Sequence, residues 1–149
     1  MVDTRRALRW LPGAALAFAV GAAQAQATPA GLWKTIDDES GQAKSYVRIT
    51  DAAGVYGGRI DKLLDPDKQD AVCDKCSDAR KGQKVLGMTI IEGVKKNPDE
   101  PYYDGGTILD PNNGKTYRVR LTPKDGGKTL EVRGFIGPFY RNQTWQRVE

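Results

Sequence analysis

The residue types that most catalytic sites need are scarce in this chain. Its 149 residues contain no histidine, which removes Ser-His-Asp and Cys-His nucleophilic mechanisms, histidine general bases and the usual imidazole metal sites. An enzyme built on this sequence would depend on carboxylates, lysine, tyrosine or cysteine. The sequence therefore favours a protein that is not an enzyme and that uses neither a metal nor a cofactor.

Cys73 and Cys76 are the only two cysteines, and they are spaced Cys-Asp-Lys-Cys. In an exported chain such a pair is most simply a disulfide that closes a tight loop. A thioredoxin-like redox pair would need a strand-to-helix setting, which the flanking sequence does not supply. Structural zinc would need two further Cys or His ligands, and the chain has none. We expect a disulfide that shapes its loop.

Carboxylates are concentrated in two segments, at 37–39 and at 65–78. Neither segment has the ligand positions and central glycine of a calcium loop, so acid-rich surface turns are the expected structure. A paired-carboxylate hydrolase needs two carboxyl groups at a set separation in space, and no spacing here indicates one. A carboxylate-based hydrolase is accordingly the third of three functional hypotheses for this chain.

Aromatic side chains are distributed at roughly one per expected strand, which suits the core of a small β domain. Most should fill that core, but those on inward faces could line a cavity, because a small barrel either is packed solid or holds one small ligand. The candidate ligand-binding residues are Trp33, Tyr46, Tyr56, Tyr103, Tyr117, Phe135 and Trp145.

The elements that must position these residues are short strands. The clearest is a hairpin, in which residues 104–109 lead through the turn Asp-Pro-Asn-Asn-Gly at 110–114 into a second strand. There Tyr117, Val119 and Leu121 alternate with arginines, so the period of two places these three on one face and the arginines on the other.

The same strand-and-turn pattern continues from Gly31 to the end of the chain, with no helix-period segment of useful length. Eight antiparallel strands in sequence order can remove both exposed edges by closing into an up-and-down barrel. A two-sheet sandwich is the alternative. The predicted strands are 32–36, 43–50, 55–62, 85–92, 102–110, 115–122, 129–135 and 141–148, and residues 63–83 form the main irregular loop.

The N-terminus has the features of an export signal. Three arginines precede an apolar run at 10–20 and two overlapping Ala-Gln-Ala sites, which predicts a signal peptide over 1–25, cleaved after Ala25 or Ala27, and a single domain over 26–149. The apolar run is shorter than the roughly 20 residues of a membrane-spanning helix. A periplasmic or secreted protein is expected, exported by the general secretory route or, given its Arg-Arg pair, by the twin-arginine route.

Positive charge is concentrated near the C-terminus. The formal net charge is +4, and it falls to about +2 once the leader is removed, yet from Lys115 to Glu149 there are eight Lys or Arg against three acids. A solvated outer face explains this simply. The second functional hypothesis is binding to an anionic surface of the cell envelope, with no role for nucleic acid. The residues that would carry it are Arg118, Arg120, Arg133 and Arg141.

Gly31-Leu32-Trp33 near the start and Arg147 near the end resemble the arrangement of the calycins and lipocalins, in which an arginine of the last strand covers the tryptophan of a G-x-W motif. Such a cation over the indole face would hold the barrel shut at one end. The barrel-closing pair implied by this resemblance is Trp33 with Arg147.

Several longer segments resemble a family of small secreted bacterial proteins classed as a domain of unknown function. They are GLWKTIDDESG, VYGGRI, the Cys-Asp-Lys-Cys loop followed by Gly-Met, YDGGTILDPNNGKTY and LEVRGFIG with Trp-Gln-Arg, and they span essentially all of the mature chain. The resemblance implies a lipocalin-like antiparallel barrel in the periplasm or outside the cell, with no established activity. Tyr103 stands where that family usually has tryptophan, which bears on the size of any pocket that this aromatic lines.

We therefore expect an all-β, eight-stranded antiparallel up-and-down barrel of the lipocalin-like kind. Its first functional hypothesis is the binding of a small, partly apolar ligand in the cell envelope.

Overall fold

The computed structural model describes residues 27–149. The predicted signal peptide over 1–25 and the first predicted cleavage site, after Ala25, lie outside the described residues. Within 27–149, no helix has both the length and the apolar character needed to cross a bilayer.

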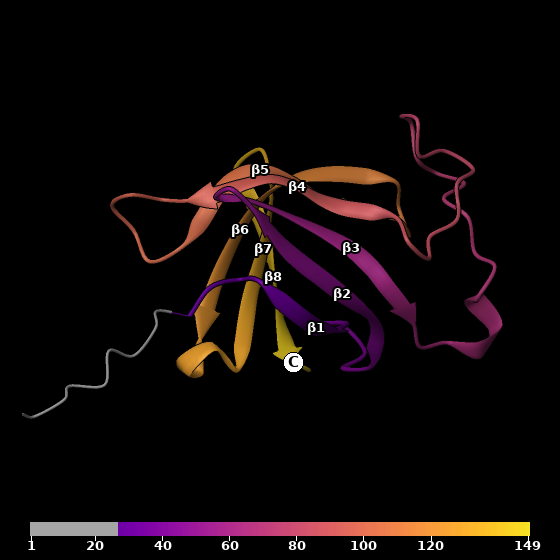
Figure 1. Cartoon of the computed structure of the whole chain (residues 1–149). Helices are drawn as coiled ribbons and strands as arrows, with labels where there is room; N and C mark the ends of the chain where they lie inside the picture. The colour runs from indigo at the N-terminus through magenta and orange to yellow at the C-terminus, as the bar shows by residue number, and fades with distance from the viewer. Residues whose placement is uncertain (1–26) are drawn as a thin grey trace, which may run out of the picture.

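Eight strands in sequence order form one closed antiparallel barrel, in which each strand pairs with the next and the last pairs with the first (Figure 1). The fold is thus the predicted all-β barrel and not the two-sheet sandwich. Two short 3-10 turns, η1 (Pro66–Lys68) and η2 (Asp125–Gly127), interrupt the connections. The strands are β1 (Gly31–Ile36), β2 (Ala43–Ala52), β3 (Val55–Leu63), β4 (Thr89–Lys96), β5 (Tyr103–Asp110), β6 (Lys115–Lys124), β7 (Thr129–Ile136) and β8 (Phe139–Arg147).

This connectivity gives the barrel two different ends. The turns after β1, β3, β5 and β7 meet at one end, and those after β2, β4 and β6 meet at the other, beside the start of β1 and the finish of β8. The long connection over residues 64–88, here called the disulfide loop, extends from the first of these ends (Figure 1). We call that end the mouth and the opposite one the closed end.

At the closed end Trp33 and Arg147 join the first strand to the last. Trp33 is fully buried, and its indole nitrogen donates a hydrogen bond of 2.7 Å to the carbonyl of Pro29. The guanidinium carbon of Arg147 lies 4.2 Å from the centre of the Trp33 ring. The same guanidinium donates to the carbonyls of Gly127, Ala30 and Thr28. One side chain thereby ties together β8, the η2 turn and the segment that leads into β1.

The conformation of Gly31 explains why glycine precedes this tryptophan. Its φ is +142°, and a Cβ placed there would lie 2.3 Å from the Nη1 atom of Arg147 and 2.9 Å from the carbonyl oxygen of Glu149. Any other residue would collide with the arginine and would also strain the backbone. The glycine of the G-x-W motif therefore leaves free the space that the arginine side chain occupies.

The fourth predicted strand, 85–92, is wrong in its bounds. β4 runs over Thr89–Lys96, and the apolar residues Val85 and Met88 belong to the disulfide loop, where they are buried against the barrel. Gly87 has a φ of +86° and ends the loop in a turn. Gly93, which the sequence suggested as a strand end, instead sits within β4 at a φ of +72°, where the β3–β4 register shifts. Glycine at a β-bulge lets a strand continue where its pattern indicates a break.

The last hairpin is also tighter than predicted. β8 begins at Phe139 and not at residue 141, and Ile136 pairs directly with Phe139 across a two-residue turn. Gly137 supplies the positive φ, +53°, that such a turn requires. Residues 136–140 consequently form the tip of a hairpin and not a separate connection.

Replacing Arg147 with alanine should destabilise the barrel by about 3 kcal/mol, since it removes a cation–π contact and three hydrogen bonds donated by a charged group. Urea unfolding followed by circular dichroism measures the change. The matched control is Arg59→Ala, because Arg59 is exposed and its one ion pair, with Asp61, is long at 3.7 Å. That variant should lose less than about 0.5 kcal/mol. Equal losses in the two variants would mean that the closing contact does not stabilise the barrel.

Candidate functional site

A cavity of about 510 Å³ opens at the mouth. Sites for small organic molecules usually have volumes of about 300–1,000 Å³, so this one is large enough for such a ligand. Its wall is largely apolar, with contributions from all eight strands and from the disulfide loop. The apolar side chains of the wall are Ile36, Ile60, Leu63, Ala71, Val72, Val85, Ile90, Ile108, Leu109, Val132 and Trp145.

Small residues from three strands leave the part of the cavity nearest the mouth unfilled. Thr35 on β1, Ser45 on β2 and Gly134 on β7 all line it. The two hydroxyl groups lie 2.9 Å apart and hydrogen-bond to each other, and the Ser45 amide donates to Thr35 Oγ1 at 3.1 Å. Both buried hydroxyls are therefore satisfied, and this part of the wall does not need a ligand to be stable.

A chain of polar side chains crosses the mouth from β8 to the β1–β2 turn; we call it the mouth network. Arg141 donates to both carboxylate oxygens of Asp38, at 2.6 and 2.5 Å. Gln143 donates to the same carboxylate at 3.4 Å and accepts a hydrogen bond of 2.9 Å from the indole nitrogen of Trp145. A buried aromatic of the cavity wall is thereby linked through one glutamine to an ion pair at the surface.

This network keeps its carboxylate ionised. The hydrogen bonds from Arg141 hold the pKa of Asp38 below its usual range, and the same contact raises the pKa of Arg141. The neighbouring Asp37, which lines the cavity, also has a lowered pKa because the backbone amides of Glu39 and Ser40 donate to it. Both carboxylates are thus stabilised as anions, which is unlike the raised pKa that a general acid needs.

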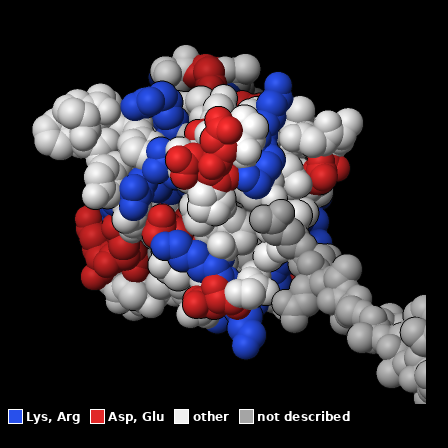
Figure 2. Space-filling model, turned by 90° about the vertical axis from the view of Figure 1, so that its left-hand side faces the viewer, with Lys and Arg blue, Asp and Glu red and all other residues white. Residues whose placement is uncertain are grey.

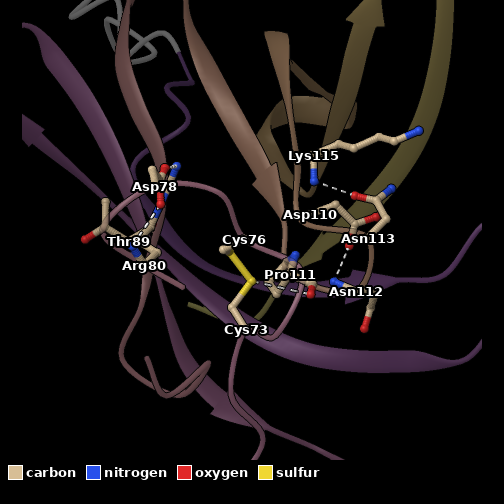
Figure 3. Close-up of a disulfide and its surroundings, with 10 residues drawn as sticks. All are labelled: Cys73, Cys76, Asp78, Arg80, Thr89, Asp110, Pro111, Asn112, Asn113 and Lys115. Carbon is tan, nitrogen blue, oxygen red and sulfur yellow. Dashed lines mark hydrogen bonds and ion pairs between the residues drawn. A yellow bond between two sulfur atoms is a disulfide. The ribbon is translucent and has the colours of Figure 1, made fainter. Parts of the chain in front are cut away.

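The disulfide loop forms one side of the mouth. Backbone hydrogen bonds of Gly87 and Met88 join it to Ile60 of β3, and two further attachments hold it elsewhere on the barrel. Cys73 and Cys76 form a disulfide, and both are buried (Figure 3). The sulfur of Cys73 lies 3.7 Å from the carbonyl oxygen of Pro111 in the β5–β6 turn. Gly114 of that turn passes so close to Lys75 that a Cβ there would be 2.0 Å from its carbonyl oxygen. The cross-linked segment therefore packs directly on the hairpin turn.

The second attachment is an arginine. Arg80 pairs with Asp78 at 2.6 Å and also donates to the carbonyl of Thr89 at the start of β4, 3.1 Å away (Figure 3). The hydrogen bonds from Arg80 lower the pKa of Asp78 to about 2. Because Ala71, Val72 and Val85 of this loop line the cavity, these contacts set the position of one of its walls.

Two of the seven candidate ligand-binding aromatics line the cavity, namely Tyr117 and Trp145. The hydroxyl of Tyr117 accepts a hydrogen bond of 2.9 Å from Asn113. Tyr56 and Tyr103 are buried with their rings 5.0 Å apart in an edge-to-face contact, and neither touches the cavity. Burial raises the pKa of both.

The remaining three candidates are elsewhere. Trp33 is buried beneath Arg147 at the closed end. The ammonium group of Lys62 lies 5.7 Å from the centre of the Tyr46 ring. The guanidinium of Arg118 lies 5.6 Å from the centre of the Phe135 ring. Tyr46 alternates with the buried Val47, which places its ring on the outside of the barrel. The structure thus separates the seven aromatics into cavity wall, core and outer surface.

Several residues of the site were not among the candidates for ligand binding. Asp38 and Arg141 form the ion pair of the mouth although they are 103 positions apart in the chain. Asp38 stood in an expected acid-rich turn, and Arg141 was a candidate only for binding an anionic surface. The loop residues Val72 and Val85 lie in an irregular segment, where Val72 bridges to Lys84 and the Val85 amide donates to the carbonyl of Ala71. The only sequence signal there was a few apolar side chains among many charges. Within residues 27–149, no group of three Cys, Asp or Glu is arranged to hold a metal ion.

An up-and-down barrel of eight strands, plugged at one end and hollow at the other, defines a lipocalin-like class of protein. The solved structure of protein HP1028 from the human pathogen Helicobacter pylori, which belongs to the lipocalin family, superimposes with a TM-score of 0.70. The two chains are 19% identical, and the match covers 83% of this chain and 84% of that one. At this identity the likeness shows the fold alone.

The family model described as an uncharacterized protein conserved in bacteria (DUF2147) matches residues 31–147, and this chain belongs to that family. The match runs from the first strand to the last. A comparison with curated protein sequences found no match.

Replacing both cysteines with alanine should loosen the disulfide loop and leave the barrel formed. The crosslink closes a very short segment, so the loss of global stability should be at most about 2 kcal/mol. Hydrogen exchange measured by mass spectrometry should show faster exchange over residues 71–85, where the amides of Cys73 and Val85 are bonded within the loop. The β7–β8 hairpin is the internal control. Equal acceleration in that hairpin would show that loop and barrel unfold as one unit.

The Asp38 carboxyl should titrate below its usual value of 3.8 because of Arg141. A carboxyl whose pKa is lowered by folding stabilises the native state fully above the unfolded pKa, and that contribution is lost as the pH falls through the lower folded value. Carboxyl ¹³C NMR measures the folded pKa. Arg141→Gln should raise it, and Arg59→Gln should leave it unchanged. An unaltered Asp38 titration in Arg141→Gln would contradict the ion pair.

Proposed function

We propose that this protein binds a small, partly apolar molecule in the bacterial cell envelope and is a binding protein, not an enzyme. The observation that carries the proposal is the cavity of about 510 Å³ at the mouth, whose wall is apolar and whose rim is charged. An apolar group placed against that wall would be removed from water, which would stabilise the complex by roughly 25 cal/mol for each Å² of apolar surface buried.

The rim favours a ligand with one polar end. Lys44, Lys68, Asp65 and Asp110 line the cavity near the surface, together with the mouth network. A polar end group can exchange water for these side chains, whereas it would find few partners among the aliphatic residues deeper in the barrel. The bound molecule would therefore point its apolar part toward the interior and its polar part toward solvent.

The envelope location rests on the leader predicted over residues 1–25 and on the disulfide. A structural disulfide persists in an oxidising compartment such as the periplasm. Two features favour a binding protein over an enzyme. The chain has no histidine, and Asp37 and Asp38 have lowered pKa values, so both remain ionised at neutral pH.

Filling the cavity tests the proposal. Ile108→Trp adds a large side chain on the cavity wall, and Val55→Trp adds the same group at the β2–β3 turn, where Val55 is exposed at the closed end. The probe is 1-anilinonaphthalene-8-sulfonate, a small apolar molecule with one charged end, excited directly at a wavelength that tryptophan does not absorb. Ile108→Trp should weaken its binding at least about tenfold, and Val55→Trp should not change it.

Native mass spectrometry of the protein purified from a bacterial envelope is the second measurement. It should detect a bound small molecule that the Ile108→Trp variant lacks. Equal probe binding by both variants, together with a ligand-free mass in the unaltered protein, would overturn the proposal. Thermal unfolding of each variant shows whether it is folded.

A further inference from the structure

The most exposed large apolar side chains of the described barrel lie together at the tip of the β7–β8 hairpin. Ile136, Phe139 and Tyr140 are 52%, 73% and 58% exposed, whereas the other large apolar residues that reach the surface are at most 44% exposed. Gly137 and Pro138 form the turn between them. We call residues 136–140 the hairpin tip. It holds two aromatic rings and an isoleucine in water on a narrow projection of the sheet.

Arginines surround the base of the tip. Arg118 donates a hydrogen bond to the carbonyl of Gly137 and lies over the ring of Phe135, and Arg133 lies over the ring of Tyr140 at 4.4 Å. Arg120 is held between Tyr102 and Phe135, at 3.9 and 5.2 Å from the two ring centres. The three cations and the rings alternate across the outside of β6, β7 and β8; we call them the arginine–aromatic face.

Part of this positive charge is not neutralised. Arg133 lies 3.6 Å from a carboxylate oxygen of Glu131, and Arg141 is paired with Asp38. Over residues 27–149, neither Arg118 nor Arg120 makes an ion pair, and the Nε atom of Arg120 is buried without a hydrogen-bond acceptor. The unpaired guanidinium charges of Arg118 and Arg120 therefore favour a partner that supplies anionic oxygens.

The tip and the cavity share one end of the barrel. The β7–β8 turn belongs to the mouth, and Gly134 and Arg141, which flank the tip on the two strands, both line the cavity. A surface that held the tip would consequently face the opening. Over the face seen in Figure 2, which is the left-hand side of the view in Figure 1, Lys and Arg are mixed with Asp and Glu.

We propose that the hairpin tip inserts into the headgroup region of an anionic lipid bilayer while Arg118 and Arg120 bind lipid phosphates, so that the β7–β8 side of the mouth faces the membrane. Aromatic and aliphatic side chains on a projecting turn are stabilised at the boundary between headgroups and acyl chains, and near-surface arginines add attraction to anionic lipid. A narrow projection suits a soft lipid phase better than a protein partner, because specific protein interfaces bury about 800 Å² on each side. The docking does not depend on whether the cavity holds a ligand.

Vesicle flotation tests the proposal with residues 26–149, which contain every strand of the barrel and lack the apolar leader. Vesicles of phosphatidylcholine with about one-third phosphatidylglycerol should bind the protein, and vesicles of phosphatidylcholine alone should bind it much more weakly. Binding to the anionic vesicles should fall as salt is raised from 50 to about 500 mM, because added salt screens exposed charges.

Two pairs of variants assign the contact. Phe139→Ser with Tyr140→Ser removes the rings of the tip, and Val55→Ser is its control at the closed end. Arg118→Gln with Arg120→Gln removes the unpaired cations, and Lys95→Gln with Lys128→Gln is the control of equal charge, since both lysines are exposed. Each test variant should bind at least about tenfold more weakly than its control. Circular dichroism melting confirms that all four variants are folded.

The outcomes separate docking from ligand binding. Absence of binding to anionic vesicles, or equal binding by test and control variants, would overturn the docking, and so would equal binding to vesicles of either composition. A concentration-dependent dimer in analytical ultracentrifugation that disappears in Phe139→Ser with Tyr140→Ser, without vesicle binding, would assign the tip to a second copy of the chain instead. The Ile108→Trp variant should still bind vesicles, because its altered side chain lies in the cavity.

Discussion

The fold depends on the seam where the first strand meets the last. The other seven strand pairs align between four and eight residue pairs, but β1 and β8 align only two, Trp33 with Arg147 and Lys34 with Gln146. A ladder this short would leave two sheet edges only weakly joined. The Arg147 guanidinium offsets the shortage, since it covers an aromatic ring and bonds to three carbonyls that no strand would otherwise satisfy. Burial lowers the pKa of this arginine, but its ordinary value is so high that the group remains charged.

With one end closed in this way, the interior divides into two regions with different contents. At the closed end, Trp33, Tyr56 and Tyr103 fill the barrel with aromatic rings. Toward the mouth the inward positions carry Thr35, Ser45 and Gly134, which are too small to meet across the barrel. The cavity is thus a direct result of where large and small side chains fall along the strands. The disulfide loop then supplies a wall from outside the sheet, and it is held by its covalent link and by backbone hydrogen bonds to Ile60 of β3.

The fold was accessible from the sequence because it rests on patterns that are local. Alternation at Tyr117, Val119 and Leu121 specifies a strand and its inward face, and the glycine and tryptophan at 31 and 33 mark the seam. The predicted strand bounds are wrong where a glycine has a role that the local sequence does not reveal. Gly93 lets a strand continue through a bulge, whereas Gly87 ends a loop. Apolar composition does not distinguish a strand from a loop that is buried against the barrel, so the sequence places residues 85–88 in the fourth strand.

The candidate site was accessible only in part. Tyr117 and Trp145 were found because they are aromatic residues on inward positions. Phe135 is three residues from the inward-facing Val132 on the same strand, so it faces outward. Selecting residues only because they are aromatic does not take this alternation into account. The pairing of Asp38 with Arg141 joins the first turn to the last strand, and no local pattern reports a contact between the two ends of a chain. Closure of the barrel creates that contact, so it becomes visible only once the strands are assembled.

The ion pair at the mouth also determines how the opening responds to acidity. Histidine is the side chain whose charge ordinarily changes between about pH 5 and 8, and this sequence contains none. Asp38 is held anionic and Arg141 cationic well beyond that interval. This ion pair therefore keeps both of its charges over that interval, so the mouth network does not act as a pH-dependent switch.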